Sequence, residues 1–155
     1  MIEQLSRKGN PGSVKFSCSN TSNPLDFSFS GIKTAVLYYL RDKGYKPGVK
    51  NVKIPGNLIN DIAASFQETV FQALIRKTLF ACKSKRVGGL IVCGGVAANN
   101  RLREKFFESC AENNLNCYFP PKNLCTDNAA MVAGLGSLLY KKGARSGLGL
   151  SANLD

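Results

Sequence analysis

The stretch GGLIVCGGVAANNRLREKFFESCAENNLNCYF, residues 88–119, decides the fold of this chain. Its first apolar run ends in two glycines, a charged segment follows, and a second short apolar run closes the stretch. This order predicts a strand over residues 89–93, a helix from about Asn99 to Glu112 and a second strand over residues 116–119. Because a helix is the usual connection between two parallel strands, we expect an α/β fold.

Helices are expected on both sides of this unit. Residues 55–85 carry apolar residues at three- and four-residue spacing, with Asn57 as a candidate N-cap and Asp61 suited to the positive end of the helix. Residues 31–43 predict an earlier helix that ends at Gly44, and a last helix is predicted from about Asn128 to Lys141. The apolar stripe of the 55–85 helix consists of Ile59, Ile62, Phe66, Val70 and Leu74.

The 155 residues read as one incomplete domain. Residues 1–25 are a polar, irregular lead-in, residues 26–54 hold the segment FSFSGIKT and a basic loop, residues 55–141 form a helix–strand–helix–strand–helix core, and residues 142–155 are a tail. Two strands alone do not make a stable parallel sheet, whose faces and edges must be covered. We therefore expect further strands of the sheet to lie upstream of this sequence.

Composition limits the chemistry that the chain supports. It has no histidine, which excludes Ser–His–Asp triads, Cys–His pairs and histidine-based metal sites built by this chain alone. Its six cysteines include no CxxC pair, which argues against a zinc knuckle and favours buried, reduced thiols. No apolar run approaches the roughly 20 residues of a membrane span, and no signal-peptide core follows Met1. We expect a cytoplasmic protein without membrane contact.

The net charge of +11 is unevenly distributed. Residues 1–86 carry 14 Lys and Arg against 5 acidic residues, whereas residues 87–155 carry 7 against 5. The densest basic stretch is RDKGYKPGVKNVK, residues 41–53. Such an excess suits a polyanion, because each phosphate that is neutralised releases condensed counterions. The alternative is a solvated basic loop that serves only solubility.

Two candidate sites follow the two predicted strands, at the edge where open α/β sheets bind ligands. In GGVAANNRLR, residues 94–103, Gly94 and Gly95 leave room for a ligand against the backbone, and Asn99 can donate and accept hydrogen bonds. The same glycines also fit a plain tight turn. In CTDNAAM, residues 125–131, Asp127 is either the cap of the last helix or a carboxylate held out as a metal ligand.

A third candidate lies near the start of the chain. In DFSFSGIKT, residues 26–34, the polar residues Ser28, Ser30 and Lys33 alternate with aromatic rings. This pattern fits a binding loop, and it fits plain packing of Phe27 and Phe29 equally well.

Taken together, NPLDFSFSGIKTAV (residues 23–36), GGVAANNRLR and CTDNAAMVAGLG (residues 125–136) resemble one family. They are similar, in order and spacing, to the C-terminal half of the bacterial tRNA threonylcarbamoyladenosine synthases, formerly labelled O-sialoglycoprotein endopeptidases or glycoproteases. The resemblance covers residues 1 to about 150. It implies an actin-like ATPase fold, with two ribonuclease-H-like lobes around a nucleotide cleft, of which this chain is part of the second.

The resemblance also implies an activity. The family transfers a threonylcarbamoyl group from its adenylate to the exocyclic amine of the adenosine 3′ of the anticodon, in tRNAs that read codons beginning with A. By motif, Asp127 matches the aspartate that joins two histidines of an upstream HxxxH motif around iron or zinc, and Asn99 matches the asparagine that contacts the adenylate. We expect the basic segment, through Lys33, Lys43, Lys46 and Lys50, to hold tRNA phosphates.

The HxxxH motif and the first lobe are not in this sequence, so we expect the chain to be inactive alone and to act with an N-terminal half. Other expected partners are the paralogous scaffold subunit and the ATPase subunit of threonylcarbamoyladenosine synthesis. The competing interpretation is a non-catalytic scaffold module of the same pathway or a nonfunctional fragment. A peptidase is disfavoured by the absence of histidine, and a kinase or ATPase of the same fold by the CTDN motif.

Overall fold

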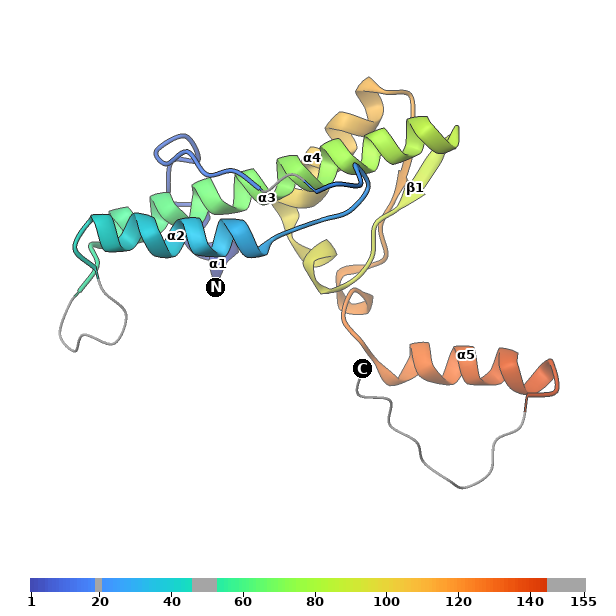
Figure 1. Cartoon of the computed structure of the whole chain (residues 1–155). Helices are drawn as coiled ribbons and strands as arrows, with labels where there is room; N and C mark the ends of the chain where they lie inside the picture. Colours follow the sequence, from blue (N-terminus) through green and yellow to red (C-terminus); the bar gives the residue numbers. More distant parts are fainter. Residues whose placement is uncertain (19–20, 46–52, 145–155) are drawn as a thin grey trace.

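A computed structural model describes residues 1–18, 21–45 and 53–144 of the chain (Figure 1). Long helices dominate it, and a small sheet lies beside them. The elements in chain order are α1 (Ile2–Ser6), α2 (Ser30–Asp42), α3 (Gly56–Lys85), β1 (Gly89–Ile91), the 3₁₀ helix η1 (Gly95–Ala98), α4 (Asn100–Glu112), β2 (Asn116–Tyr118), the 3₁₀ helix η2 (Lys122–Leu124) and α5 (Ala129–Lys141).

The sheet consists of β1 and β2, which pair in parallel with Leu90 opposite Cys117. One further bond, from the Val92 N–H to the Tyr118 carbonyl at 2.9 Å, continues the pairing past the end of β1. Helix α4 makes the crossover between the two strands. The α/β architecture with parallel strands is therefore confirmed, although both strands are shorter than the sequence predicts.

The core lies between α3, α4 and the sheet. It is built from five buried side chains, and Leu102, Phe106 and Cys110 of α4 recur at four-residue spacing on one face of that helix. Two residues of α3 complete the cluster, Phe71 and Ile75, and residues of both strands pack around it. This core fixes α4 against α3 and therefore fixes the crossover that connects the two strands.

Helix α3 differs from the prediction in two ways. It begins after Pro55, without a side-chain cap, so the expectation that Asn57 caps it is wrong; Asn57 lies within its first turn. Asp61 accepts a hydrogen bond from the backbone N–H of Asn10 at 2.8 Å and thereby ties the N-terminal segment to the helix. The predicted apolar stripe is only half-buried. Ile59, Ile62 and Phe66 line an apolar groove of about 380 Å³ that α1 and α2 also border.

The N-terminal lead-in, predicted to be irregular, contains the short helix α1. A five-residue helix is too short to leave a periodic signal in the sequence. It is held by packing against α3 and by Glu3, whose carboxylate accepts hydrogen bonds from Arg7 and from Asn100. Gly9 permits this close docking, because a Cβ atom at that position would clash with the backbone oxygen of Asn60.

Helix α5 stands apart from the body of the described chain (Figure 1). It buries no residue, and Val132 is 74% exposed. Other large apolar side chains of α5 are also exposed: Met131, Leu135, Leu138, Leu139 and Tyr140. No helix in the described ranges combines the length and apolar character that crossing a membrane requires.

The six cysteines are free thiols, as expected. Cys82, Cys110 and Cys125 are buried, whereas Cys93 is exposed beside the glycine turn. Burial, together with the neighbouring Cys110 thiol, raises the pKa of Cys117 to about 12. The Cys117 thiol therefore stays protonated at neutral pH and packs as a small apolar side chain.

The α3–α4 core generates a paired prediction. Phe106→Ala should lower the free energy of unfolding by about 3–5 kcal/mol, because the side chain is 3% exposed and its removal leaves a cavity. Phe107→Ala, the control on the next residue, should cost less than about 1 kcal/mol, since Phe107 is 48% exposed. Urea unfolding followed by circular dichroism measures both; equal losses of stability would contradict the assignment of the core.

Candidate functional site

The two sequence motifs GGVAAN and CTDN leave the sheet at the same edge. Parallel strands have their carboxyl ends together, so the segment after β1 and the segment after β2 emerge side by side. The structure brings them into contact: a Cβ atom on Gly95 would lie 3.8 Å from the methyl carbon of Thr126. The turn that contains Gly94, Gly95 and Asn99 therefore lies beside the segment that carries Asp127.

The two glycines of the turn have different roles. Gly94 has φ +95°, in a region that L side chains rarely adopt, so the turn itself requires glycine there. Gly95 has no such requirement, and a Cβ atom on it would make only ordinary contact. Within the described ranges, the backbone N–H groups of Gly95 and Val96 have no hydrogen-bond acceptor. The turn geometry thus explains Gly94, while Gly95 leaves the backbone open to a ligand.

Asn99 is the N-cap of α4, which begins one residue later than predicted. Its side-chain oxygen accepts from the Leu102 N–H at 3.1 Å, and its amide nitrogen donates to Gln67 of α3 at 2.9 Å. An asparagine side chain has two N–H donors and two acceptor lone pairs. Asn99 therefore keeps one donor and one acceptor site for another partner.

Asp127 does not cap α5. The cap is Asn128, whose side-chain oxygen accepts from the Met131 N–H at 3.1 Å, so the interpretation of Asp127 as a helix cap is wrong. Asp127 is exposed, and no described residue hydrogen-bonds or ion-pairs with its carboxylate. The reason is conformational: Asn128 has the extended backbone, φ −151° and ψ 156°, that an N-cap requires.

The described residues do not complete a metal site around this carboxylate. They contain no group of three or more His, Cys, Asp or Glu side chains that could hold a metal ion. The Asp127 carboxylate can supply one oxygen ligand to a metal ion. A metal held there by three such side chains would therefore need at least one of them from outside the described residues.

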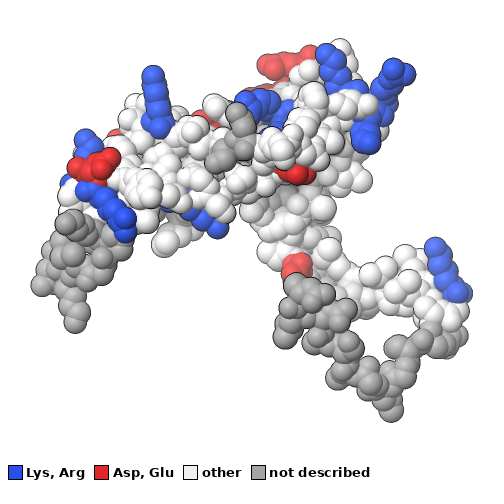
Figure 2. Space-filling model, viewed as in Figure 1, with Lys and Arg blue, Asp and Glu red and all other residues white. Residues whose placement is uncertain are grey.

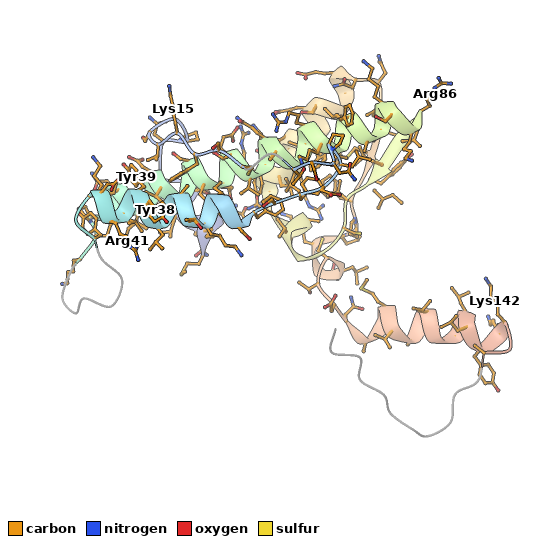
Figure 3. All side chains as sticks on the ribbon, viewed as in Figure 1. Lys15, Tyr38, Tyr39, Arg41, Arg86 and Lys142 are labelled. Carbon is orange, nitrogen blue, oxygen red and sulfur yellow. The ribbon has the colours of Figure 1, made fainter. Side chains whose placement is uncertain are left out.

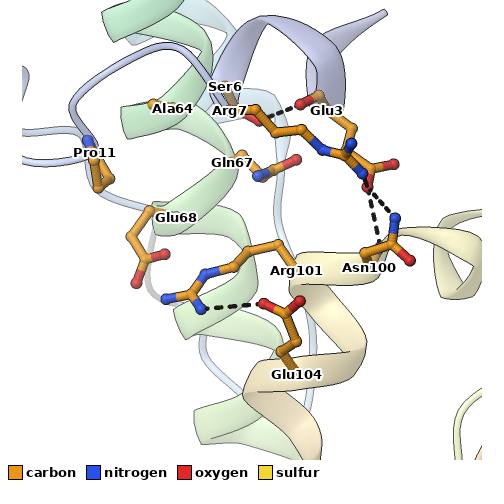
Figure 4. Close-up of a pocket in the computed structure, with 10 residues that line it drawn as sticks. All are labelled: Glu3, Ser6, Arg7, Pro11, Ala64, Gln67, Glu68, Asn100, Arg101 and Glu104. Carbon is orange, nitrogen blue, oxygen red and sulfur yellow. Dashed lines mark hydrogen bonds and ion pairs between the residues drawn. The ribbon is translucent and has the colours of Figure 1, made fainter.

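One cavity borders the turn, and a second adjoins the start of α4. One, of about 390 Å³, lies against Gly95 and Asn99 and is otherwise mostly apolar. The other, of about 370 Å³, lies between α1, α3 and α4, and Gln67 borders both. Figure 4 shows the residues that line the second cavity: Glu3, Ser6, Arg7, Pro11, Ala64, Gln67, Glu68, Asn100, Arg101 and Glu104.

Glu3 places a negative charge beside the start of α4. Its carboxylate accepts from the backbone N–H of Asn100 at 3.2 Å and from the side-chain amide of the same residue at 2.9 Å. Burial acts to raise the pKa of Glu3, but the hydrogen bonds from Asn100 and Arg7 outweigh it and hold the pKa below its ordinary value. Glu3 is therefore ionised at neutral pH.

The predicted tRNA-binding lysines lie elsewhere. Lys33 and Lys43 are exposed on or just after α2, whose C-terminal end points away from η1 (Figure 1), and Lys46 and Lys50 fall outside the described residues. Lys43 lies over the Tyr39 ring, 5.8 Å from its centroid, and Arg41 lies over Tyr38 (Figure 3). On the face shown in Figure 2, Lys and Arg side chains are spread over several elements without forming one continuous patch.

The segment DFSFSGIKT is tied to α3 by its rings. Phe27 and Phe29 stack with their centroids 5.8 Å apart, and the Lys77 ammonium lies 5.5 Å from the centroid of Phe27. Lys77 also donates to the backbone oxygen of Asp26. These contacts favour the packing interpretation of this segment over a binding loop formed by Ser28 and Ser30.

Sequence reasoning missed three residues of the site. Gln67 is buried in the middle of an apolar helix, and a polar residue at such a position was the available signal. Glu3 reaches Asn100 across 97 positions of sequence. Arg103 donates hydrogen bonds to the backbone oxygens of Ala97, in η1, and of Pro120, after β2. No local sequence pattern encodes such contacts.

Comparison with known proteins identifies the family of the chain. The family described as tRNA N6-adenosine threonylcarbamoyltransferase matches residues 1–134. The chain belongs to this family. Similar curated proteins carry the same description: one from Clostridium botulinum is 44% identical over 154 residues, one from Clostridium kluyveri 41% over 153, and one from Symbiobacterium thermophilum 40% over 151.

These threonylcarbamoyltransferases are considerably longer than this chain. Each alignment covers 97% of the chain but only 42–43% of the relative. The chain therefore spans less than half the length of the curated family members that it matches.

The position of Asn99 at the start of α4 generates a second prediction. Asn99→Ala should lower the free energy of unfolding by about 1 kcal/mol, because it removes the oxygen that accepts from Leu102. Asn99→Ser keeps a capping oxygen and should retain most of that stability. Thermal unfolding of both variants measures the difference, and equal melting temperatures for the two would show that the cap does not matter.

Proposed function

We propose that this chain forms the C-terminal lobe of an enzyme that transfers a threonylcarbamoyl group from threonylcarbamoyl-adenylate to tRNA. The acceptor is the exocyclic amine of the adenosine 3′ of the anticodon, in tRNAs that read codons beginning with A. Membership of the family supports the reaction class. The observation that carries the assignment to this chain is the Asp127 carboxylate, which is exposed and unused as a cap, and which follows Thr126, the residue that lies against Gly95.

The proposed fold is the second lobe of an actin-like ATPase fold. It is supported by the parallel strand–helix–strand unit and by the surfaces that this unit leaves uncovered. The two-stranded sheet has two open edges, and the apolar side chains of α5 are exposed in the described part of the chain. An N-terminal region like the one its relatives carry would cover such surfaces, and we assign the rest of the nucleotide cleft to that region.

The nucleotide part of the substrate is proposed to bind at the glycine turn. Gly95 exposes its backbone, and within the described ranges the N–H groups of Gly95 and Val96 are unused donors for polar atoms of an adenylate or of ATP. Asn99 adds one donor and one acceptor at the same place. The adjoining cavity of about 390 Å³ is mostly apolar, which suits the faces of an adenine ring.

Asp127 is proposed to be one ligand of a divalent metal, iron or zinc. Such a metal would act as a Lewis acid on the carbamoyl carbonyl. The contribution of this chain is to hold one carboxylate oxygen at the edge of the sheet, next to the nucleotide turn. Because an aromatic amine is a weak nucleophile, correct placement of the reacting groups should supply much of the rate.

The decisive experiment compares two variants of the complete enzyme, meaning this chain together with the N-terminal region that its relatives carry. Asp127→Asn should abolish bound metal and tRNA modification while leaving the melting temperature of the metal-free enzyme unchanged, because Asn128 provides the cap. Asn99→Ser should keep the metal and weaken nucleotide binding by roughly 1–3 kcal/mol, the cost of leaving buried polar groups without partners. Metal analysis by mass spectrometry and nucleotide titration separate the two roles.

The chain without the N-terminal region is the negative control and should give no modified tRNA from threonine, bicarbonate, ATP and the adenylate-forming enzyme. If Asp127→Asn retains both its metal and its activity in the complete enzyme, the assignment of the carboxylate is wrong. Robust modification by the isolated chain would also contradict the proposal.

A further prediction concerns tRNA. Lys33, Lys43, Lys46 and Lys50 are proposed to bind its phosphates without reading sequence. Replacing Lys43, Lys46 and Lys50 by Gln should weaken binding and flatten its salt dependence, by about 0.7 in slope for each single-strand phosphate that is no longer neutralised. Affinity measured across a salt series tests this, with Lys142→Gln at the end of α5 as the control. Unchanged slope and affinity would identify the segment as a solvated loop.

A further inference from the structure

The Arg103 side chain contacts both loops of the site. Its Nε donates to the backbone oxygen of Ala97 in η1 at 2.6 Å, and its Nη2 donates to the backbone oxygen of Pro120 after β2, also at 2.6 Å. The same Nη2 lies 3.2 Å from the Cys125 sulfur, two residues before Asp127. The guanidinium also stacks over the ring of Phe119, 4.8 Å from its centroid.

This set of contacts spans two separate segments of chain. Ala97 belongs to the turn after β1, whereas Phe119, Pro120 and Cys125 belong to the segment after β2. A guanidinium presents several N–H donors in one rigid plane, so a single side chain can hold two carbonyl oxygens in a set geometry. An ammonium is a point donor on a flexible stem and does not reproduce that geometry.

We propose that Arg103 is a positioning residue that locks the nucleotide turn and the aspartate-bearing loop into one unit. Its guanidinium sets the separation between the Gly94–Asn99 turn and the Asp127 loop, and it touches neither substrate nor metal. The inference rests on the proposed function, since it assigns the two loops to one bound substrate.

The consequence is coupling between two binding events. If the loops move as one unit, a metal held with the help of Asp127 restrains the turn that receives the nucleotide, and each ligand changes the affinity of the other by the same factor. If the loops move independently, the two ligands bind without such mutual influence. Arg103 is the residue whose replacement should convert the first behaviour into the second.

The first test uses Cys125 as a reporter in this chain itself. Cys125 is 3% exposed and lies under the guanidinium, so release of the loop should open it to N-ethylmaleimide. Arg103→Lys, which keeps the charge, should raise the labelling rate of Cys125 by at least about tenfold, as measured by peptide mass spectrometry. Cys110, 1% exposed in the core, should stay protected, and the exposed Cys93 should react rapidly in every variant.

Arg101→Lys is the matched control, because Arg101 lies on the same helix and pairs with the exposed Glu104 at 3.4 Å. It should leave Cys125 protected. If Cys125 also stays protected in Arg103→Lys, the inference is wrong. If Cys110 becomes reactive together with Cys125, the substitution has loosened the whole core, and the specific positioning role is likewise refuted.

The second test measures coupling in the complete enzyme, with AMP and Zn²⁺ as probes. In the unmodified enzyme, Zn²⁺ should change the dissociation constant of AMP by at least about fivefold, and in Arg103→Lys by less than about twofold. Coupling that survives the substitution, or that is absent from the unmodified enzyme, overturns the inference but not the proposed function. An enzyme that binds no AMP refutes the proposed function, and the inference falls with it.

Discussion

The parallel pairing of β1 with β2 is the constraint on which the site depends. It sends both carboxyl ends to one edge of the sheet, so that two segments far apart in sequence become neighbours. The pairing requires a crossover, and α4 provides it. The crossover in turn is held by the buried cluster between α3 and α4, in which Leu102, Phe106 and Cys110 pack against α3. The core thus positions the site without belonging to it.

The parts of the fold that the sequence predicts correctly are those with a local cause. The strand–helix–strand order follows from apolar runs punctuated by glycines, and the start of α4 is predicted to within one residue. The parts that it misses depend on distant partners. Helix α1 packs against α3, Gly9 lets the chain approach the backbone of Asn60, and Glu3 bonds to Asn100 far along the chain. Neither contact has a periodic signature.

The start of α5 shows a second limit of prediction from the local sequence. Aspartate and asparagine are almost equally good caps, so the sequence alone leaves both Asp127 and Asn128 as candidates for the N-cap of α5. Only the backbone decides, and the extended conformation of Asn128 makes it the cap. The outcome matters for function, because a capping carboxylate would be committed to its own helix. With the cap supplied by its neighbour, the Asp127 carboxylate is available for chemistry.

Electrostatics at the start of α4 further restrict what the site can accept. The N-terminus of a helix normally favours an anion, but here the first N–H of α4 is already bonded to the ionised Glu3. A phosphate brought to this point would meet a negative charge in place of a free donor. The unused N–H donors in the described turn lie earlier in the chain, at Gly95 and Val96, and they carry no charge. If the turn binds an adenylate as proposed, cations at the start of α4 can offset part of its charge: Lys122 contacts the Asn100 side chain, and Arg7 pairs with Glu3.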